Sequence, residues 1–159
     1  MKRIWYVALG AILCSCSTPE EQKEASGNTQ ASVIIEQNEK NKKLVLDFYQ
    51  NTFGDKNFDK INQYLATEYI QHNPEVSDGV EAFKMGVQEW LKDTPKTKIN
   101  VQHVAADGDF VFVHLKNISP EGKLISTIDI FRVKDNKIVE HWDVHQSVPE
   151  KSANQHPMF

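Results

Sequence analysis

Asp129 is the acidic residue that the C-terminal part of the chain best places for proton chemistry, because it lies in an alternating apolar segment. If Asp135-Asn136 forms a two-residue hairpin loop, Asp129 lies opposite Trp142 and shares a strand face with Phe131. An apolar wall favours the protonated form of a carboxyl group, which then exchanges a proton near neutral pH. We therefore take Asp129 as a candidate general acid or base. The alternative is a structural carboxylate that backbone donors or a dimer contact hold.

The hairpin register divides these two strands into two faces. We choose the face that carries Asp129 as the interior, and its further pairs are Phe131–Glu140, Thr127–Val144 and Ile125–Gln146. The outer face then carries the pairs Ile128–Asp143, Ile130–His141 and Ser126–His145. A β-bulge in either strand would exchange the two faces, so this choice depends on regular pairing.

Two histidines are candidates to act beside Asp129. His114 shares a strand face with Phe112, and it reaches the face of Asp129 if the loop around residues 120–122 closes with two residues. A three-residue loop with a bulge would turn His114 to the opposite face, and it could also be a satisfied core histidine. His72 precedes Asn73-Pro74, where it either contacts a ligand or caps a helix end.

A metal site and a nucleic-acid partner are not expected. His141 and His145 have the i, i+4 spacing of helical metal ligands, but on a strand they lie about 13 Å apart. Zinc-ligand spacing and a glycine-rich phosphate loop are also absent from the sequence. The 159 residues carry 22 acidic and 18 basic side chains without a Lys/Arg cluster, which argues against nucleic acid.

The elements that must position these residues change their period after Pro95. Apolar spacing predicts helices over residues 44–54, 58–65 and 80–91, and alternation predicts strands over residues 98–105, 110–118, 123–133 and 138–147. Three helices followed by an antiparallel meander make an α+β domain. A long curved sheet around helices encloses a cone, and an open cone is a pocket for a small apolar molecule.

Four sequence segments follow one another in a characteristic order: Tyr69-Ile-Gln-His-Asn-Pro74, Gly108-Asp-Phe-Val-Phe-Val-His114, Ile128-Asp-Ile-Phe-Arg132 and Lys137-Ile-Val-Glu-His-Trp-Asp143. Over residues 40–147 the chain thereby resembles the SnoaL-like (polyketide cyclase-like) branch of the nuclear transport factor 2-like superfamily. The resemblance implies a cone-shaped α+β fold, a homodimer, and cofactor-free acid–base chemistry on small apolar carbonyl compounds. His114 and Asp129 match the family's strand histidine and neighbouring aspartate, which makes them the candidate catalytic pair.

Two function classes remain open. In the first, a lyase or isomerase uses Asp129 to move a proton next to a carbonyl, and His114 donates to the forming oxyanion. In the second, a ligand-binding lipoprotein holds the same molecule without turnover. Gln146 stands where epoxide-hydrolysing relatives carry an acid, which argues against epoxide hydrolysis. The predicted pocket residues are His72, Phe112, Phe131, Trp142 and Gln146.

The N-terminal segment has the pattern of a bacterial lipoprotein signal. Lys2 and Arg3 precede an apolar run of ten residues that ends in Leu13-Cys14-Ser15-Cys16. Only Cys16 has a small residue directly before it, so Cys16 is the predicted lipidation site; a plain secretory signal or an uncleaved anchor is the alternative. We therefore expect a lipid-anchored cell-envelope protein that faces the periplasm or the exterior. Its parts are a signal peptide (1–15), a flexible tether (16–32), a SnoaL-like domain (33–150) and a tail (151–159).

Overall fold

The computed structural model describes residues 19–119 and 121–159, so the predicted lipidation site at Cys16 lies outside the described residues. The chain divides into two units, Met1–Val33 and Ile34–Phe159. The elements are α1 (Pro19–Tyr49), a π-helical turn (Gln50–Gly54), a 3-10 turn (Phe58–Lys60), α2 (Ile61–Tyr64), β1 (Leu65–Gln71), α3 (Val80–Leu91), β2 (Val101–Asp107), β3 (Phe110–Ile118), β4 (Leu124–Lys134) and β5 (Lys137–Ser147). Across the residues described, no helix combines the length and the apolar character that crossing a membrane requires.

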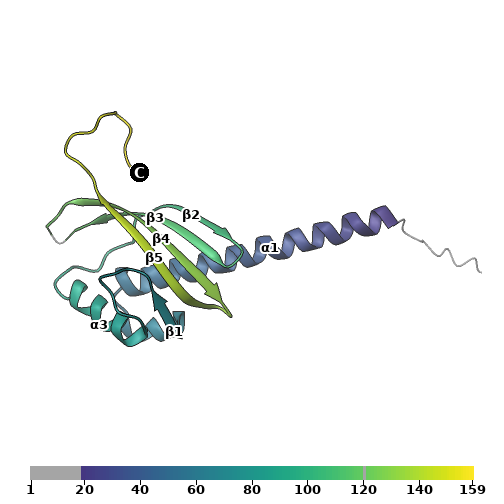
Figure 1. Cartoon of the computed structure of the whole chain (residues 1–159), viewed down its shortest axis with the longest axis horizontal. Coiled ribbons are helices and arrows are strands. Elements are labelled where there is room, and N and C mark those ends of the chain that lie inside the picture. Colours follow the sequence, from purple (N-terminus) through teal and green to yellow (C-terminus); the bar gives the residue numbers. More distant parts are fainter. Residues whose placement is uncertain (1–18, 120) are drawn as a thin grey trace, which may run out of the picture. The chain divides into compact units, whose positions relative to one another are not determined.

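The α+β class and the three predicted helical regions are confirmed, but the sheet is mixed. Its order is β1-β5-β4-β3-β2, and β1 pairs with β5 in parallel while every other neighbouring pair is antiparallel. Figure 1 shows α3 on one side of this curved sheet and the C-terminal tail returning towards the other side. The parallel edge escaped prediction because β1 pairs with residues about 70 positions away, which no local pattern encodes.

Residues 19–32 are helical, whereas we expected a tether without regular structure. The reason is visible in the sequence once a helix is considered. Pro19 suits the first helical position, and the acidic pair Glu20-Glu21 suits the positive N-terminal end of the helix dipole. Glu, Gln, Lys and Ala, which make up much of this segment, are also good helix formers.

Aromatic side chains fill the space between the sheet and the helices of the second unit. The Phe48 ring on α1 lies 5.8 Å from Phe83 on α3 and 6.0 Å from Phe131 on β4, measured between ring centroids. Tyr49 contacts Phe131 edge-on at 5.6 Å. The core also includes Val45, Ile61, Leu65, Tyr69, Val87, Val111, Val113, Leu115, Val133 and Ile138. We expected the interior of the cone to be open, but these side chains fill it.

The β4–β5 hairpin follows the predicted register for only two pairs. Asp135 and Asn136 both have positive φ, as a two-residue primed turn requires, and Lys134 pairs with Lys137. Val133 pairs with Ile138, but Arg132 already pairs with Glu140, so Val139 is an extra residue in β5. This β-bulge shifts every later pair by one position and reverses which residues of β5 face the core.

Candidate functional site

The bulge turns the polar residues His141, Asp143 and His145 of β5 towards the interior, next to Asp129 and Thr127 of β4. Asp129 pairs directly with Asp143, and Thr127 pairs with His145. Asp129 faces the core as predicted, together with Phe131 (both about as buried as the apolar core). The neighbours that we predicted for them on β5 are wrong, because the pairing is displaced by one residue.

His141 and Asp129 form a buried pair at the centre of this cluster. His141 Nε2 lies 2.8 Å from Asp129 Oδ1, and the two residues are 7% and 3% exposed. Asp129 Oδ2 is also buried and has no hydrogen-bond partner among the described residues. A charged or polar group in such a place needs a partner to offset its lost hydration, so the single bond to His141 matters for folding.

The hydrogen bonds of Gln71 on β1 assign the protons of this pair. Gln71 Oε1 accepts the backbone N–H of Asn73, so it is the amide oxygen that faces His141 Nδ1 at 3.0 Å. His141 Nδ1 therefore carries a hydrogen and donates it to Gln71. In a neutral ring, Nε2 would then be bare and would face a carboxylate oxygen of Asp129 at hydrogen-bond distance. A hydrogen bond at this distance therefore needs one proton, carried by either His141 or Asp129.

Asp143 and His145 form the outer part of the cluster. Asn73 donates through Nδ2 to both carboxylate oxygens of Asp143, at 2.8 and 2.9 Å, and His145 Nε2 lies 3.5 Å from Asp143 Oδ2. Burial alone would raise the pKa of Asp143, but hydrogen bonds from His145 and Asn73 and the charge of His141 lower it below its usual value. The hydrogen bond to Asp143 raises the pKa of His145. Asp143 is therefore ionised at neutral pH, and it stabilises the protonated form of His145 on its exposed side.

Two tyrosine hydroxyl groups lie around the buried pair. Burial raises the pKa of Tyr49 well above its usual value, and the negative charge of Asp129 raises it further. Burial, and then the charge of Asp129, raise the pKa of Tyr69 as well. Gln71 Nε2 donates to the Tyr69 hydroxyl oxygen at 3.2 Å. Both tyrosines thus stay protonated and can donate a hydrogen bond.

The surface next to this cluster is an open depression rather than a deep pocket. A depression of about 610 Å³ is lined by Gln71, the last residue of β1, and by residues 72–78 of the β1–α3 connection. Two of its lining residues, Gln71 and Asn73, bond to His141 and Asp143. The depression therefore adjoins the cluster through these two bonds, although neither Asp129 nor His141 lines it.

Three side chains of the cluster could also hold a metal ion. Among the described residues, Asp129, His141 and Asp143 each offer one ligand atom, and these atoms all lie within 4.8 Å of one another. Sequence reasoning considered only His141 and His145 as ligands, and it placed His141 on the outer face.

The structure separates His114 from Asp129, so the predicted pairing of these residues in one pocket is wrong. His114 pairs with Ile128, on the outer face, as the alternative of a three-residue loop implied: Ser119 N–H donates to Lys123 O, and Gly122 has a positive φ. Its Nε2 bonds to Ser126 Oγ at 2.9 Å, and its Nδ1 lies 3.1 Å from His103 Nδ1. The histidine beside Asp129 is His141 instead.

The remaining predicted pocket residues lie on the outer face, with the exception of Phe131. Trp142 stacks on His72 with ring centroids 4.3 Å apart. Phe112 pairs with Ile130 and is exposed, and Gln146 is exposed opposite Ser126. Trp142 and Gln146 lie on this face because of the bulge in β5. Phe112 and His114 lie on it because of the register that the β3–β4 connection sets.

Sequence reasoning missed His141, Asp143 and Gln71. The alternation His141-x-Asp143-x-His145 is visible in the sequence, and the adjacent apolar pair Ile138-Val139 before it is the one local hint of a bulge. Polar residues inside a core contradict the hydrophobic pattern, so only the observed pairing identifies them.

Comparisons with known proteins agree with this architecture. The structure resembles an LEH-like epoxide hydrolase from M. tuberculosis (TM-score 0.57, 16% identity, 69% of this chain and 85% of that one). It also resembles a candidate ketosteroid isomerase from Kribbella flavida (TM-score 0.58, 16% identity, 74% and 85%) and an NTF-2 like protein of unknown function from Burkholderia xenovorans (TM-score 0.59, 16% identity, 72% and 89%). At these identities the likeness shows the fold alone, which is that of the nuclear transport factor 2-like proteins.

The profile of the SnoaL-like polyketide cyclases matches residues 43–151, which is more than half of the chain. The protein belongs to this family, and the resemblance stated from its sequence motifs is confirmed. No protein of curated function matches the sequence significantly.

A double-mutant cycle tests whether Asp129 is coupled to His141 rather than to His114. Asp129→Ala should lower the free energy of unfolding by about 3–5 kcal/mol, because it leaves a buried imidazole without its partner. In the double variant Asp129→Ala/His141→Ala, the loss of unfolding free energy should differ from the sum of the two single losses by at least about 1 kcal/mol. Chemical denaturation of the four chains measures this coupling.

The matched control cycle combines Asp129→Ala with His114→Ala. These residues lie on opposite faces, so their effects should add within about 0.5 kcal/mol. Strong coupling in the control cycle and none in the first would contradict the observed register.

Proposed function

We propose that this protein is an acid–base lyase or isomerase that moves a proton next to the carbonyl group of a small apolar molecule. The observation that carries the proposal is the buried 2.8 Å contact between His141 Nε2 and Asp129 Oδ1, next to the carboxylate of Asp143, whose pKa is lowered. Family membership supports it at the level of fold, and the activity is our inference from the side chains.

The proposed step uses the two carboxylates in different roles. Asp143 accepts the proton from the carbon next to the carbonyl group, and the C–H electron pair forms the enol double bond. The proton shared by Asp129 and His141 goes to the carbonyl oxygen at the same time, so no free enolate charge builds up. The reverse transfers return both protons, to the same carbon or to a neighbouring one.

The aromatic surroundings support this assignment. Phe131 stacks on the His141 ring at 4.7 Å, so water is excluded from one side of the pair. In a dry environment a shared proton interacts more strongly with its partners than it would in water. Access requires the β1–α3 connection to shift, because Asn73 bonds across to Asp143.

The burial of the pair favours a second candidate function, binding without turnover. Asp129 and His141 are almost inaccessible, and the adjoining depression is open and polar. In this alternative, a cell-envelope protein holds a small molecule against the β1–α3 connection, and the Asp129–His141 pair serves stability alone.

Deuterium incorporation into a panel of apolar ketones, followed by NMR in heavy water, separates these candidates. Asp129→Asn should keep the fold, because its amide can donate to His141 Nε2 in place of the shared proton. It should nevertheless lower the exchange rate by about 10²–10⁴, the usual contribution of a proton-transferring group. Asp143→Asn should have an effect of the same order.

His103→Gln is the control for this assay, since it removes an imidazole from the outer face and should leave exchange unchanged. No exchange by the parent chain with any ketone that binds would support the binding candidate. A loss of exchange in His114→Gln without a loss in His141→Gln would overturn the assignment of the acid.

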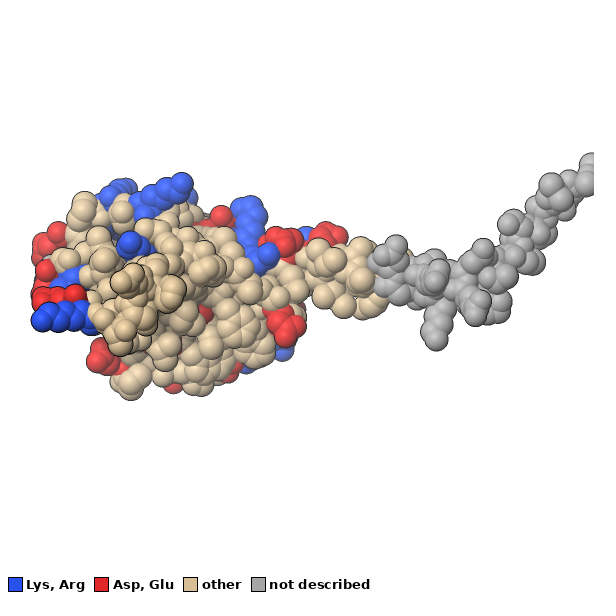
Figure 2. All heavy atoms as spheres, turned by 90° about the horizontal axis from the view of Figure 1, so that it is seen from above, with Lys and Arg blue, Asp and Glu red and all other residues tan. Residues whose placement is uncertain are grey.

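We also propose that the protein forms a homodimer through the outer face of the sheet. This face carries exposed apolar side chains, namely Phe110, Phe112, Ile128 and Val144. Figure 2 views the molecule from this side and shows charged side chains mostly along its edges. Apolar surface of this kind, rimmed by polar groups, marks contact sites in soluble proteins.

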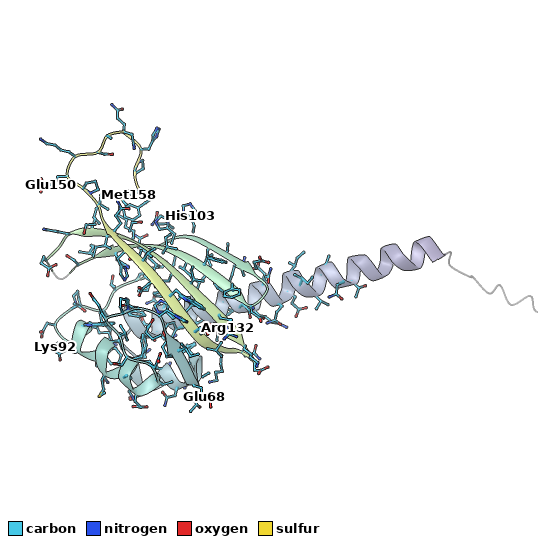
Figure 3. All side chains as sticks on the ribbon, viewed as in Figure 1. Glu68, Lys92, His103, Arg132, Glu150 and Met158 are labelled. Atoms are coloured by element: carbon cyan, nitrogen blue, oxygen red, sulfur yellow. The ribbon has the colours of Figure 1, made fainter. Side chains whose placement is uncertain are left out.

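The C-terminal tail contacts this face on β3. The Phe159 ring lies 5.8 Å from the His114 ring, measured between centroids, and Lys116 Nζ lies 4.9 Å from the centroid of the Phe159 ring. Figure 3 shows Met158 and His103 on the same side of the sheet, away from Lys92 at the end of α3. The apolar side chains nearer β5 stay available to a partner.

Sedimentation of residues 17–159, which include every described residue, tests the dimer. We expect a dimer at micromolar concentration and a monomer for Ile128→Glu, because a buried unpaired charge opposes association. Met85→Glu on α3 is the control and should remain dimeric, since Met85 lies outside the proposed interface. A monomeric parent chain would contradict the proposal.

Finally, we propose that lipid on Cys16 anchors the protein to a bacterial membrane, facing the periplasm or the exterior. The support is the sequence pattern alone, an apolar run followed by a small residue and a cysteine. Mass spectrometry of the mature N-terminus should find a diacylated Cys16, and Cys16→Ala should release the chain from membranes. A mature protein that begins at another residue would contradict this anchor.

A further inference from the structure

The cluster of Asp129, His141 and Asp143 has a geometry that one ion could occupy. His141 Nε2 lies 2.8 Å from Asp129 Oδ1 and 4.0 Å from Asp143 Oδ2, and all three ligand atoms fit within 4.8 Å. An ion that holds its ligands at about 2.1 Å places them about 3.0 Å apart for right-angle coordination and about 3.4 Å apart for tetrahedral coordination. The observed separations bracket these values.

The orientation of the His141 ring is the one that metal ligation requires. Nδ1 donates to Gln71 Oε1, and Gln71 is itself held by Asn73 N–H and by the Tyr69 hydroxyl. Histidines that bind metals donate their second ring nitrogen to such an oxygen, which fixes the ring and leaves the other nitrogen free to ligate. Nε2 of His141 is this free nitrogen, and it points at a carboxylate.

The carboxylate of Asp129 also has an unsatisfied oxygen beside its ligand atom Oδ1. Its Oδ2 is buried without a hydrogen-bond partner, although the residue is only 3% exposed. A buried carboxylate oxygen without a partner is rare, because it loses its hydration and gains nothing in exchange. A cation beside the carboxylate removes this imbalance.

The charges of the cluster also favour a dication. Asp129 and Asp143 are directly opposed on neighbouring strands, where two like charges repel each other. Asn73 orients Asp143 by donating to both of its oxygens. His145 offsets part of the charge of Asp143 from the solvent side, but only His141 lies between the two carboxylates.

We propose that Asp129, His141 and Asp143 bind one divalent transition-metal ion through Oδ1, Nε2 and Oδ2. One imidazole and two carboxylates suit zinc, cobalt or manganese, and three protein ligands leave open coordination positions. Gln71 and Asn73 bond to two of the three ligands and line the open depression of residues 71–78, so the site adjoins a solvent-filled surface. The proposal goes beyond the proposed function, since it needs no turnover.

The ion and the shared proton are alternative occupants of the same position. An ion on Nε2 and Oδ1 displaces the proton between them, and an ion on Asp143 Oδ2 blocks the group that we propose accepts the carbon proton. The metal-loaded protein should therefore not exchange protons with a ketone. Metal binding and acid–base activity then exclude each other at one site.

Titration of metal-free residues 17–159 with zinc, followed by calorimetry, tests the site, and cobalt absorption reports its ligands. This chain lacks Cys14 and Cys16, so no thiol competes for the ion. We expect one zinc per chain, and an affinity lowered at least about 100-fold by Asp129→Asn or His141→Gln. Gln71→Ala touches no ion and should still lower the affinity by about 10–100-fold, because it releases the ring.

His103→Gln is the matched control, because His103 and His114 form the other histidine pair of the described chain. Zinc affinity should be unchanged in this variant. Loss of zinc binding in His103→Gln, an absence of zinc binding, or equal affinities in the parent chain and Asp129→Asn would each overturn the site. If a ligand variant does not fold, Gln71→Ala decides the question.

Ketone exchange measured with a chelator present keeps the two proposals distinguishable. Exchange without zinc binding removes only the metal site. Zinc binding without exchange removes only the proposed enzymatic function. Exchange that persists at saturating zinc would contradict the shared position of ion and proton.

Discussion

One extra residue in β5 decides the chemistry of the interior of this protein. Val139 interrupts regular pairing just beyond a tight two-residue turn, and each later residue of β5 faces the side opposite to the one that the turn alone would give it. The turn has only two residues, so a shorter turn cannot compensate for the extra residue in β5. His141 and Asp143 are inside because of this bulge, and Trp142 is outside for the same reason.

Once polar residues are inside, electrostatics requires them to be paired. Asp129 and Asp143 stand opposite each other in a region packed with aromatic rings, where an isolated carboxylate is strongly disfavoured. His141 is the partner of Asp129, and Asn73 and His145 are the partners of Asp143. The β1–α3 connection is thereby bound to the sheet through side chains. The bonds that hold this connection to the sheet are therefore also those of the proposed proton and metal site.

Aromatic packing explains why the interior is not an open cone. Phe48 and Phe131 occupy the middle of the space between sheet and helices, and each contacts several other rings. Relatives of the same fold include proteins whose names describe hydrolase and isomerase activities, so the fold itself does not set the function. Among the described residues, the buried Asp129–His141 pair is bonded through Gln71 to the end of β1, next to the depression of residues 71–78.

Much of the fold follows from local pattern, and the α+β class, the three helical regions and the four later strands were predictable for this reason. The turn at Asp135-Asn136 and the inward direction of Asp129 and Phe131 also follow from short-range chemistry, because alternation and turn residues act within a few positions. The site was predictable only in part: its aspartate could be named, whereas its histidine could not.

The tertiary structure alone decided the parallel β1 edge, the bulge at Val139 and the outward position of His114. Each of these features depends on pairing between strands. The energy difference between two registers is the sum of the packing of all side chains on both faces of the sheet, so no single residue determines it. A strand that carries apolar and polar residues on both faces leaves this choice open in the sequence. The helices settle it, because the face that packs against Phe48 and Tyr49 is the face that becomes the core.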